Sequence, residues 1–335
     1  MIFKASSLIL IVSIACAPLS CRVESFCLVP QSFSTHSNPR LAPWPISMSA
    51  SIPKAATGVD AAMDSAYDDL AQRTISRLSQ GSPLRNGQLF VGIGGGPGSG
   101  KSTLSAAVRD RINDILGEAT AVVLPMDGFH HSREELAKMA REGGNITYEA
   151  LLSRRGAPWT FDACGCVSAF VGARETGSAS LPVYCRKKSD PVTDGVALMV
   201  DHRVVLLEGN YLLAFDDPGW APLVDVFDEK WYVACESMDV QRERLIHRHL
   251  ETWTEEKTRI FGKSGREGAA IKADSNDVKN ACKLCNIKSL KLNQVPSARI
   301  IVSIFARITC GLLFCVKGWV DKMSRHHADL IVVSK

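Results

Sequence analysis

The feature that most constrains the fold of this chain is a glycine-rich segment at residues 95–103. The segment reads Gly95, Gly96, Pro97, Gly98, Ser99, Gly100, Lys101, Ser102 and Thr103. It matches the pattern G-x-x-x-x-G-K-S/T, in which successive backbone N–H groups turn inward around an anion. Glycines permit the φ and ψ angles that this turn needs. The segment therefore predicts a loop that binds the phosphates of a nucleoside triphosphate, which we take to be ATP.

The residues on either side of the loop support this interpretation. An apolar strand pattern at residues 89–93 precedes it, and a helix pattern follows, with one apolar face made of Leu104, Val108, Ile112 and Leu116. A strand–loop–helix order is what phosphate binding requires, and it disfavours a glycine-rich turn without a ligand. Lys101 would reach the β- and γ-phosphates, and the Ser102 hydroxyl would bind Mg²⁺. The start of the helix would direct its positive end at the phosphates.

Short apolar segments alternate with helical patterns along the body of the chain. The strand-like segments lie at residues 89–93, 121–125, 204–207, 231–234 and 328–333, and residues 60–78 have the spacing of an amphipathic helix. The alternation predicts an α/β fold of the P-loop NTPase type. In such a fold a doubly wound, mostly parallel sheet carries helices on both faces.

A carboxylate follows the predicted strand at residues 121–125. Asp127 comes directly after this strand and would lie at the carboxyl edge of the sheet, where ligands bind in open α/β folds. An Asp there can accept the proton of an attacking hydroxyl group. The alternative is that Asp127 caps the next helix, but Ser132 and Glu135 already form a capping box. We therefore interpret Asp127 as a catalytic base, and we expect His130 or His131 to contact the substrate, with His130 the candidate.

A second carboxylate follows the strand at residues 204–207. Glu208 ends an apolar segment in a chain that also has the glycine-rich loop, so it occupies a Walker B-like position. There it would orient Mg²⁺ directly or through water. A buried structural acid bonded to backbone N–H groups is the alternative, and the two roles are compatible. We predict that Ser102 and Glu208 hold the metal.

Seven motifs, in this order, resemble the phosphoribulokinase/uridine kinase family, which includes a bacterial type of pantothenate kinase. The motifs are GGGPGSGKST, VVLPMDGFH, RRGAPWTFD, LPVYCRKKSDPV, EGNYLL, FDEKWYV and SNDVKNA. The greatest similarity is to plant and fungal uridine-kinase-like proteins. The resemblance runs from residue 89 to 281 and resumes at 328. It implies a P-loop kinase with a lid segment over ATP.

The resemblance also implies roles for individual residues. Asp127 matches the catalytic base and Glu208 the Mg²⁺-associated acid, and the family's acceptor pocket falls on Arg154, Arg155 and Tyr184. Residues 236–252 resemble the helix that enters the lid.

On that lid-entry helix, Arg244 and Arg248 lie four residues apart and share a face, so both could point at phosphates. A solvated basic face is the alternative. We expect Arg248 to stabilise charge during transfer together with Lys101. Asn276 matches a nucleotide-side motif.

Four segments make up the predicted domain organisation. Residues 1–58 resemble a bipartite signal and transit leader of the kind that directs proteins to plastids, and we expect them to lack fixed structure. Translation from Met48 would instead give a cytoplasmic product. Residues 59–281 form the kinase domain with its N-terminal helix, and residues 325–335 supply its last strand. Residues 282–324 match nothing recognised and read as a retained intron or an insert. Arg307 and Lys317 interrupt the apolar part of that insert, which disfavours a membrane span.

These observations predict an ATP-dependent kinase that phosphorylates a hydroxyl group of a nucleoside, pantothenate or a sugar. The net charge of +4 is too small to indicate nucleic-acid binding. A P-loop ATPase or nucleotide-dependent switch acting on a protein partner is the alternative, and it gives the acceptor-pocket motifs no role. The sequence does not identify the acceptor or the oligomeric state.

Overall fold

The computed structural model describes residues 58–80, 84–143, 146–285, 299–301 and 330–334, all within one compact unit that spans Lys54–Lys335. The predicted leader, apart from residue 58, lies outside the described residues. So does most of the predicted insert.

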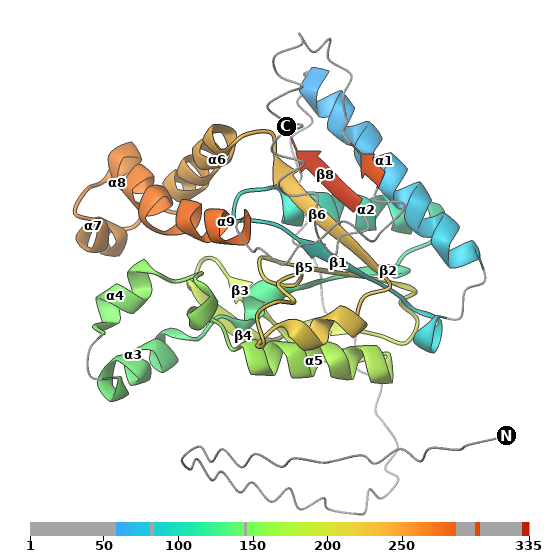
Figure 1. Cartoon of the computed structure of the whole chain (residues 1–335), viewed down its shortest axis with the longest axis horizontal. Coiled ribbons are helices and arrows are strands. Elements are labelled where there is room, and N and C mark those ends of the chain that lie inside the picture. Colours follow the sequence, from blue (N-terminus) through green and yellow to red (C-terminus); the bar gives the residue numbers. More distant parts are fainter. Residues whose placement is uncertain (1–57, 81–83, 144–145, 286–298, 302–329, 335) are drawn as a thin grey trace, which may run out of the picture. The chain divides into compact units, whose positions relative to one another are not determined.

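A six-stranded sheet forms the centre of the molecule (Figure 1), and every pairing in it is parallel. The strand order is β2-β5-β1-β6-β8-β7. The strands are β1 (Leu89–Gly94), β2 (Ala121–Pro125), β5 (Val204–Gly209), β6 (Glu229–Cys235), β7 (Arg299–Ile301) and β8 (Leu330–Ser334). All five predicted strands are present, and the α/β prediction is confirmed. Within the range 282–324, the described parts are the end of α9 and the edge strand β7.

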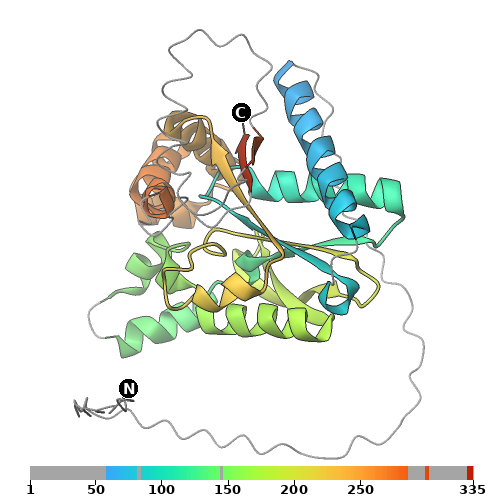
Figure 2. The ribbon, with the colours of Figure 1, turned by 45° about the vertical axis from the view of Figure 1, so that its right-hand side comes forward.

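Alternate residues of β1 face opposite sides of the sheet, as expected of a strand buried on both faces. Leu89, Val91 and Ile93 pack with α1 (Gly58–Ser79) and α2 (Lys101–Leu116). Phe90 packs on the other side with Phe170 of α5 (Ala163–Thr176). Figures 1 and 2 show α1 and α2 on one side of the sheet and α5 on the other. The two cores hold the carboxyl ends of the strands in fixed positions.

The chain between β2 and β5 forms a group of short elements beside the sheet. It contains the helical turn η2 (Met126–Phe129), the helices α3 (Arg133–Glu142) and α4 (Tyr148–Ser153), and the turn η3 (Pro158–Thr160). An antiparallel hairpin of β3 (Ala179–Cys185) and β4 (Asp190–Leu198) packs against η2. The predicted capping box is present, with the Ser132 side chain bound to the Glu135 amide and the Glu135 side chain bound to the Ser132 amide.

The chain after β6 forms a helical lid segment. It comprises α6 (Met238–Glu251), α7 (Glu255–Phe261), α8 (Gly265–Lys272), the π-helical turn η5 (Ala273–Asp277) and α9 (Val278–Cys285). Leu245, Ile246, Ala269 and Ala273 form its own small core. A π-helical turn is rare and is frequently found at functional sites. Two further turns, η1 (Arg85–Gly87) and η4 (Ala221–Asp225), complete the described elements.

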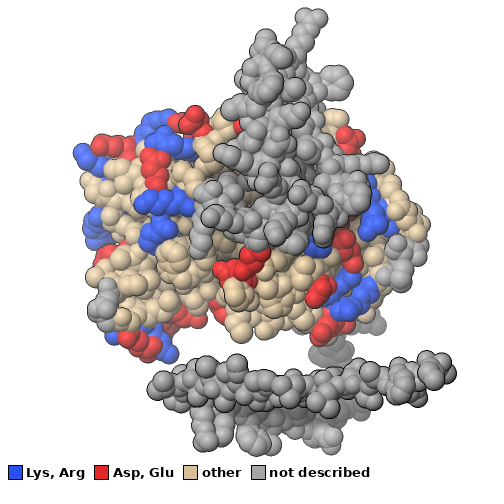
Figure 3. All heavy atoms as spheres, viewed as in Figure 1, with Lys and Arg blue, Asp and Glu red and all other residues tan. Residues whose placement is uncertain are grey.

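The surface carries both signs of charge. Figure 3 shows Lys and Arg atoms interspersed with Asp and Glu atoms over the described part of this face. Among the described helices, none has the length and apolar character that a membrane crossing needs.

Candidate active site

The glycine-rich loop joins β1 to α2, and Lys101 is the first residue of α2. Gly100 has a φ of +95°, a left-handed conformation that favours glycine, and α2 begins at the next residue. The buried Lys101 ammonium donates hydrogen bonds of 3.0 Å to the Gly96 carbonyl and 3.0 Å to Oδ1 of Asn210. The lysine therefore bridges the loop and the end of β5.

The charges around Lys101 come from three other elements. Burial lowers the pKa of Lys101, the carboxylates of Glu208 and Asp127 act in the opposite direction, and Arg248 lowers the pKa further. Asp127, Glu208 and Arg248 are thus all within electrostatic reach of the lysine. The structure brings together the four residues that the sequence predicted for phosphate binding and chemistry.

Glu208 lies between the ends of two neighbouring strands. In the sheet register it pairs with Ile93 of β1 and with Pro125 of β2, which places it beside both the loop and Asp127. The Ser102 hydroxyl donates a 3.0 Å hydrogen bond to Oε1 of Glu208. Burial raises the pKa of Glu208, and the nearby Asp127 carboxylate raises it further, against the opposing effects of Lys101 and Ser102.

These side chains fit a magnesium ion. The Ser102 hydroxyl and the Glu208 carboxylate are hard oxygen donors, which Mg²⁺ prefers, and it usually keeps several waters and phosphate oxygens as further ligands. In the described part of the chain, no group of three or more His, Cys, Asp or Glu side chains could hold a metal. The donor set thus suits an ion bound jointly by protein and nucleotide.

Asp127 lies in η2, directly after β2. Its backbone carbonyl accepts a 2.7 Å hydrogen bond from Nδ1 of His130, and within the described residues no hydrogen bond reaches its carboxylate. The Asp127 charge acts on Lys101, His130, Tyr184, Glu208 and Tyr211. A carboxylate with open acceptor positions at the centre of such a group can take a proton from a bound hydroxyl.

Helix α6 covers the loop from the lid side. Gln241 donates a 2.6 Å hydrogen bond to the Pro97 carbonyl, and Nη1 of Arg244 lies 3.3 Å from Sγ of Cys235. The Cys235 thiol in turn lies 3.6 Å from the Gly98 carbonyl. Arg244 is therefore anchored beside the loop. Arg248, one turn further along, is half-buried, and its charge lowers the pKa of Lys101.

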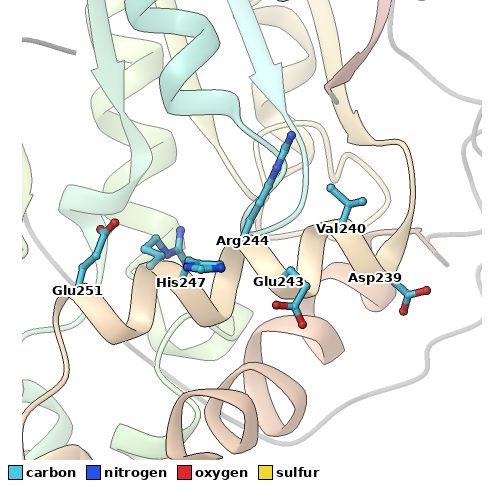
Figure 4. A pocket seen from close by; sticks show the side chains of 7 residues that line it. Asp239, Val240, Glu243, Arg244, His247 and Glu251 are labelled. Carbon is cyan, nitrogen blue, oxygen red and sulfur yellow. The ribbon is translucent and has the colours of Figure 1, made fainter. Parts of the chain in front are cut away.

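Both arginines of α6 line a shallow hollow of about 560 Å³ on this helix. The other lining residues are Asp239, Val240, Glu243, His247 and Glu251. In Figure 4, Arg244 and Val240 point to one side of α6, and Asp239 and Glu243 point to the other.

The predicted acceptor residues fall into two groups. The His130 ring lies 3.9 Å from the Phe161 ring and 5.0 Å from the Tyr184 ring, measured between centroids. Burial lowers the pKa of His130, so the ring is neutral near pH 7. Burial also raises the pKa of Tyr184, which keeps its hydroxyl protonated. His130 and Tyr184 thus form one wall next to Asp127.

Arg155 and Arg154, the other predicted acceptor residues, make hydrogen bonds within the protein. Arg155 donates to the carbonyls of Ser189 and His131 and to Oδ1 of Asp190, at 2.5, 2.7 and 2.7 Å. It thereby ties the β3–β4 hairpin to the loop after η2. Arg154 donates to the Ser275 carbonyl at 2.6 Å and so reaches the lid segment. The structure gives both arginines positioning contacts.

Asn276 lies in η5 and joins the lid to the same acceptor segment. Its amide donates a 2.7 Å hydrogen bond to the Arg155 carbonyl, and its oxygen accepts one of 3.2 Å from Asn280. The described contacts of Asn276 therefore lie at the base of the lid and not on the loop. Next to it, Nε2 of His249 lies 2.6 Å from Oδ2 of the buried Asp277.

Sequence reasoning did not single out Asn210 or Gln241. Asn210 belongs to the motif EGNYLL, two residues after Glu208. Its place in that motif could have indicated that it lies near Lys101. Gln241 reaches the loop from 144 residues away along the chain.

Comparison with known proteins shows what the chain is similar to. No family model matches it. It is 34% identical over 225 residues to a Schizosaccharomyces pombe protein provisionally named a uridine kinase, covering 66% of this chain and 86% of that protein. A pantothenate kinase of Ligilactobacillus salivarius is 23% identical over 212 residues, covering 62% of this chain and 65% of that kinase. A crystal structure from Silicibacter, provisionally named a fructose transport system kinase, superposes with a TM-score of 0.53 at 25% identity. It covers 79% of this chain and 98% of that one.

Proposed function

The chain belongs to the phosphoribulokinase/uridine kinase family of P-loop kinases, and from this premise we propose that it transfers the γ-phosphoryl group of Mg²⁺-ATP to a nucleoside, pantothenate or sugar-type acceptor. That it is a phosphotransferase acting on an alcohol group of a small molecule follows from the kinases it resembles. The three relatives named above carry different names: uridine kinase, pantothenate kinase and fructose transport system kinase. The family therefore does not identify the acceptor.

One observation carries the proposal: an open carboxylate, Asp127, lies within electrostatic reach of the loop lysine and of Glu208. In the proposed reaction Asp127 accepts the proton of the acceptor hydroxyl as that oxygen attacks phosphorus. Lys101 and Arg248 compensate the charge on the transferred group. His130 and Tyr184 form the wall against which the acceptor lies.

Ser102 and Glu208 would hold Mg²⁺ in this proposal. When bound, the ion neutralises the charge on the β- and γ-phosphate oxygens. Glu208 must be ionised to bind it, and a cation close by favours the ionised form because it offsets burial and the Asp127 charge. Most of the catalysis would come from positioning and electrostatics rather than covalent chemistry.

An acceptor screen with the full chain tests the proposal. Mg²⁺-ATP is supplied with nucleosides, pantothenate, free sugars and their phosphates or acids, and phosphorylated products are measured by mass spectrometry. The Lys101→Met variant is the blank, because it lacks the charge that the loop directs at the phosphates. Phosphorylation of an acceptor by the natural chain alone supports the kinase. ATP hydrolysis without any phosphorylated acceptor would favour the ATPase or switch.

The cellular location is a separate proposal that rests on the leader sequence alone. A plastid protein is expected if the leader at residues 1–58 is used, and a cytoplasmic one if translation begins at Met48. Imaging the full chain and a version starting at Met48, each fused to a fluorescent protein, distinguishes these outcomes.

A further inference from the structure

Residues 154–156, which we call the acceptor segment, are held by hydrogen bonds from two other parts of the chain. The Tyr211 hydroxyl donates a 2.8 Å hydrogen bond to the Gly156 carbonyl. The Asn276 amide donates one of 2.7 Å to the Arg155 carbonyl. Two adjacent carbonyls of the segment are therefore bound, one from the end of β5 and one from the lid.

The backbone at Gly156 has one defined conformation. Its φ of +101° lies in the left-handed region that favours glycine. Its N–H group donates a 2.8 Å hydrogen bond to Oγ1 of the buried Thr160, and that hydroxyl donates one of 2.8 Å to the Ala157 carbonyl. Both backbone hydrogen-bonding groups of Gly156 thus have partners, and Tyr211 supplies the one that binds the carbonyl.

Tyr211 is fixed relative to the loop lysine. It directly follows Asn210, whose Oδ1 accepts the 3.0 Å hydrogen bond from Lys101. The Tyr211 side chain is buried, with its ring stacked on Trp220 at 5.8 Å and edge-on to Phe161 at 5.5 Å between centroids. These rings leave the hydroxyl group little freedom. Two consecutive residues after β5 therefore contact the phosphate-binding lysine and the acceptor segment.

Asn276 is fixed within the lid. It lies in the π-helical turn η5 and is buried. The next residue, Asp277, has its Oδ2 2.6 Å from Nε2 of His249 in α6. Arg154 makes a second contact at the same junction, a 2.6 Å hydrogen bond to the Ser275 carbonyl. The lid thus holds the acceptor segment through a turn that is itself bonded to α6.

The Arg155 side chain connects the acceptor segment to the loop that carries Asp127. Its guanidinium group donates a 2.7 Å hydrogen bond to the His131 carbonyl and lies 5.3 Å from the centroid of the Tyr184 ring. The His130 ring lies beside Tyr184, and Nδ1 of His130 hydrogen-bonds to the Asp127 carbonyl. A displacement of the acceptor segment would therefore disturb the surroundings of the proposed base.

We propose that Tyr211 and Asn276 are positioning residues, which hold the acceptor segment and thereby align a bound acceptor with Asp127 and the phosphate to be transferred. This inference rests on the proposed kinase function and deepens it. Both side chains act through backbone carbonyls of the segment. Because the Asn276 contact comes from the lid, alignment of the acceptor should depend on the position of the lid, which favours transfer over hydrolysis of ATP.

The direct test is Tyr211→Phe in the full chain, because this change removes one hydroxyl group and keeps the packing of the ring. Uridine, pantothenate and fructose serve as acceptor probes with Mg²⁺-ATP. We expect kcat/KM for the phosphorylated probe to fall by about 10- to 100-fold. The KM for ATP and the rate of ATP hydrolysis without acceptor should each change by less than about 3-fold. A defect of folding alone would lower transfer and hydrolysis together.

Asn276→Ala tests the contact from the lid. It should lower kcat/KM for the same probe by about 10-fold or more and raise the ratio of ATP hydrolysis to transfer. Since Tyr211 and Asn276 hold adjacent carbonyls, the double variant should lose less than the product of the two single losses. Thermal unfolding identifies a variant that has lost its fold, in which case the other single variant carries the comparison.

Thr74→Val is the matched control for the loss of a buried hydroxyl group. The Thr74 hydroxyl donates a 2.7 Å hydrogen bond to the Leu70 carbonyl within α1, away from the acceptor segment. This variant should leave the acceptor kinetics and the rate of ATP hydrolysis unchanged. The effect of Tyr211→Phe would then be specific to the carbonyl that Tyr211 holds.

Hydrogen exchange measures the acceptor segment without an acceptor. With Mg²⁺ and a non-hydrolysable ATP analogue bound, the amides of residues 154–160 should exchange at least about 10-fold faster in Tyr211→Phe and in Asn276→Ala than in the natural chain. The amides of β1 and β5 should keep their natural rates. This readout is independent of which acceptor the enzyme uses.

Two outcomes would overturn the inference while leaving the kinase intact. The first is normal acceptor kinetics in Tyr211→Phe, and the second is exchange at residues 154–160 that stays at the natural rate in both variants. An equal loss of transfer and of ATP hydrolysis would also contradict it, because the defect would then lie in the ATP site. ATP hydrolysis by the natural chain without any phosphorylated acceptor would reject the kinase function itself, whatever the exchange rates show.

Discussion

Arg133 at the start of α3 and Glu256 in α7 join the acceptor side of the molecule to the lid through two parallel hydrogen bonds. Nη1 of Arg133 lies 2.8 Å from Oε1 of Glu256, and Nη2 lies 2.9 Å from Oε2. The hydrogen bond from Arg133 also lowers the pKa of Glu256. Since these two residues lie 123 positions apart in the chain, the pair is a direct link between the segment after β2 and the lid segment.

Removing this pair should loosen the lid more than it destabilises the protein. Both side chains are about one-third exposed, so the pair should contribute only about 0.2–1 kcal/mol to the free energy of unfolding. Arg133→Met and Glu256→Gln should each speed hydrogen exchange of the α7 amides, and the double variant should add little to either. Arg266→Met, which breaks an exposed pair between α8 and α6, is the control. Additive effects of the two changes would show that the pair does not hold α7.

Asp127→Asn should abolish transfer while ATP still binds. The amide keeps the size of the side chain, but it cannot take the proton of the acceptor hydroxyl, which should lower kcat by about 10²- to 10⁴-fold. Calorimetric titration measures ATP affinity, and acceptor phosphorylation measures turnover. Near-normal turnover would remove Asp127 from the mechanism.

Glu208→Gln should weaken Mg²⁺ activation and alter stability in a pH-dependent way. Loss of the carboxylate should raise the Mg²⁺ concentration for half-maximal activity by at least about 10-fold. Because the pKa of Glu208 is raised in the folded state, its contribution to stability is present at low pH and is lost as the pH rises through the folded-state pKa. In the absence of metal, Glu208→Gln should therefore have a higher melting temperature than the natural chain at pH 8. The difference in melting temperature should shrink at pH 4–5. A lower melting temperature at pH 8 would contradict the assignment.

His249 should make the fold sensitive to mild acid. Burial lowers its pKa, and Lys272 and Arg248 act in the same direction, while Asp277 opposes them. The unfolded chain therefore takes up this proton first, near pH 6.5, so stability falls as the pH drops from 7 to 5. His249→Leu leaves Asp277 unpaired and should cost about 1–3 kcal/mol at pH 7.5.

His249→Gln keeps a donor for Asp277 and should cost less than the leucine variant. Denaturant titrations of the three chains at pH 7.5 and pH 5 give the comparison. A decline in stability between these pH values that stays unchanged in His249→Gln would exclude His249 as its source.

Gly128→Ala should disturb the acceptor side without affecting the loop. A Cβ atom on Gly128 would lie 1.9 Å from the Pro182 carbonyl oxygen, a backbone atom of the β3–β4 hairpin that has no side-chain freedom. The acceptor KM should rise, or kcat should fall, by about 10-fold or more, because a small misplacement of reacting groups is costly. ATP affinity should be retained.

The matched control for this change is Gly172→Ala. Gly172 lies in α5, and the space that an alanine methyl group would occupy there is open, so the alanine should stabilise the helix by about 0.5–1 kcal/mol. Equal acceptor kinetics in Gly128→Ala and the natural chain would show that the hairpin can move without consequence.

The parts of the site that were predictable depend on local patterns. Lys101 and Ser102 belong to a contiguous motif, and Asp127 and Glu208 each follow an apolar strand. Parallel strands end at the same edge of a sheet, so two acids that follow such strands were expected to meet there. The register that pairs Glu208 with Pro125, two residues before Asp127, agrees with this expectation.

The contacts of Arg155 could not be read from a local pattern. Its motif indicates the acceptor pocket, and the structure adds that its guanidinium group donates hydrogen bonds to Asp190, Ser189 and His131. Which neighbours a long side chain reaches depends on how the hairpin packs, and nothing near Arg155 in sequence encodes that packing. The same holds for Gln241 on the Pro97 carbonyl and for the pair of Arg133 and Glu256.

The sequence by itself determined the strand-loop-helix unit, the parallel sheet and the carboxylates at its edge, because hydrophobic periodicity and glycine geometry act over a few residues. Only the tertiary structure decided that Arg133 meets Glu256 and that Gln241 reaches the Pro97 carbonyl. Electrostatic energy depends on distance in space, and the packing of α6, α7 and α8 sets those distances after the chain has folded.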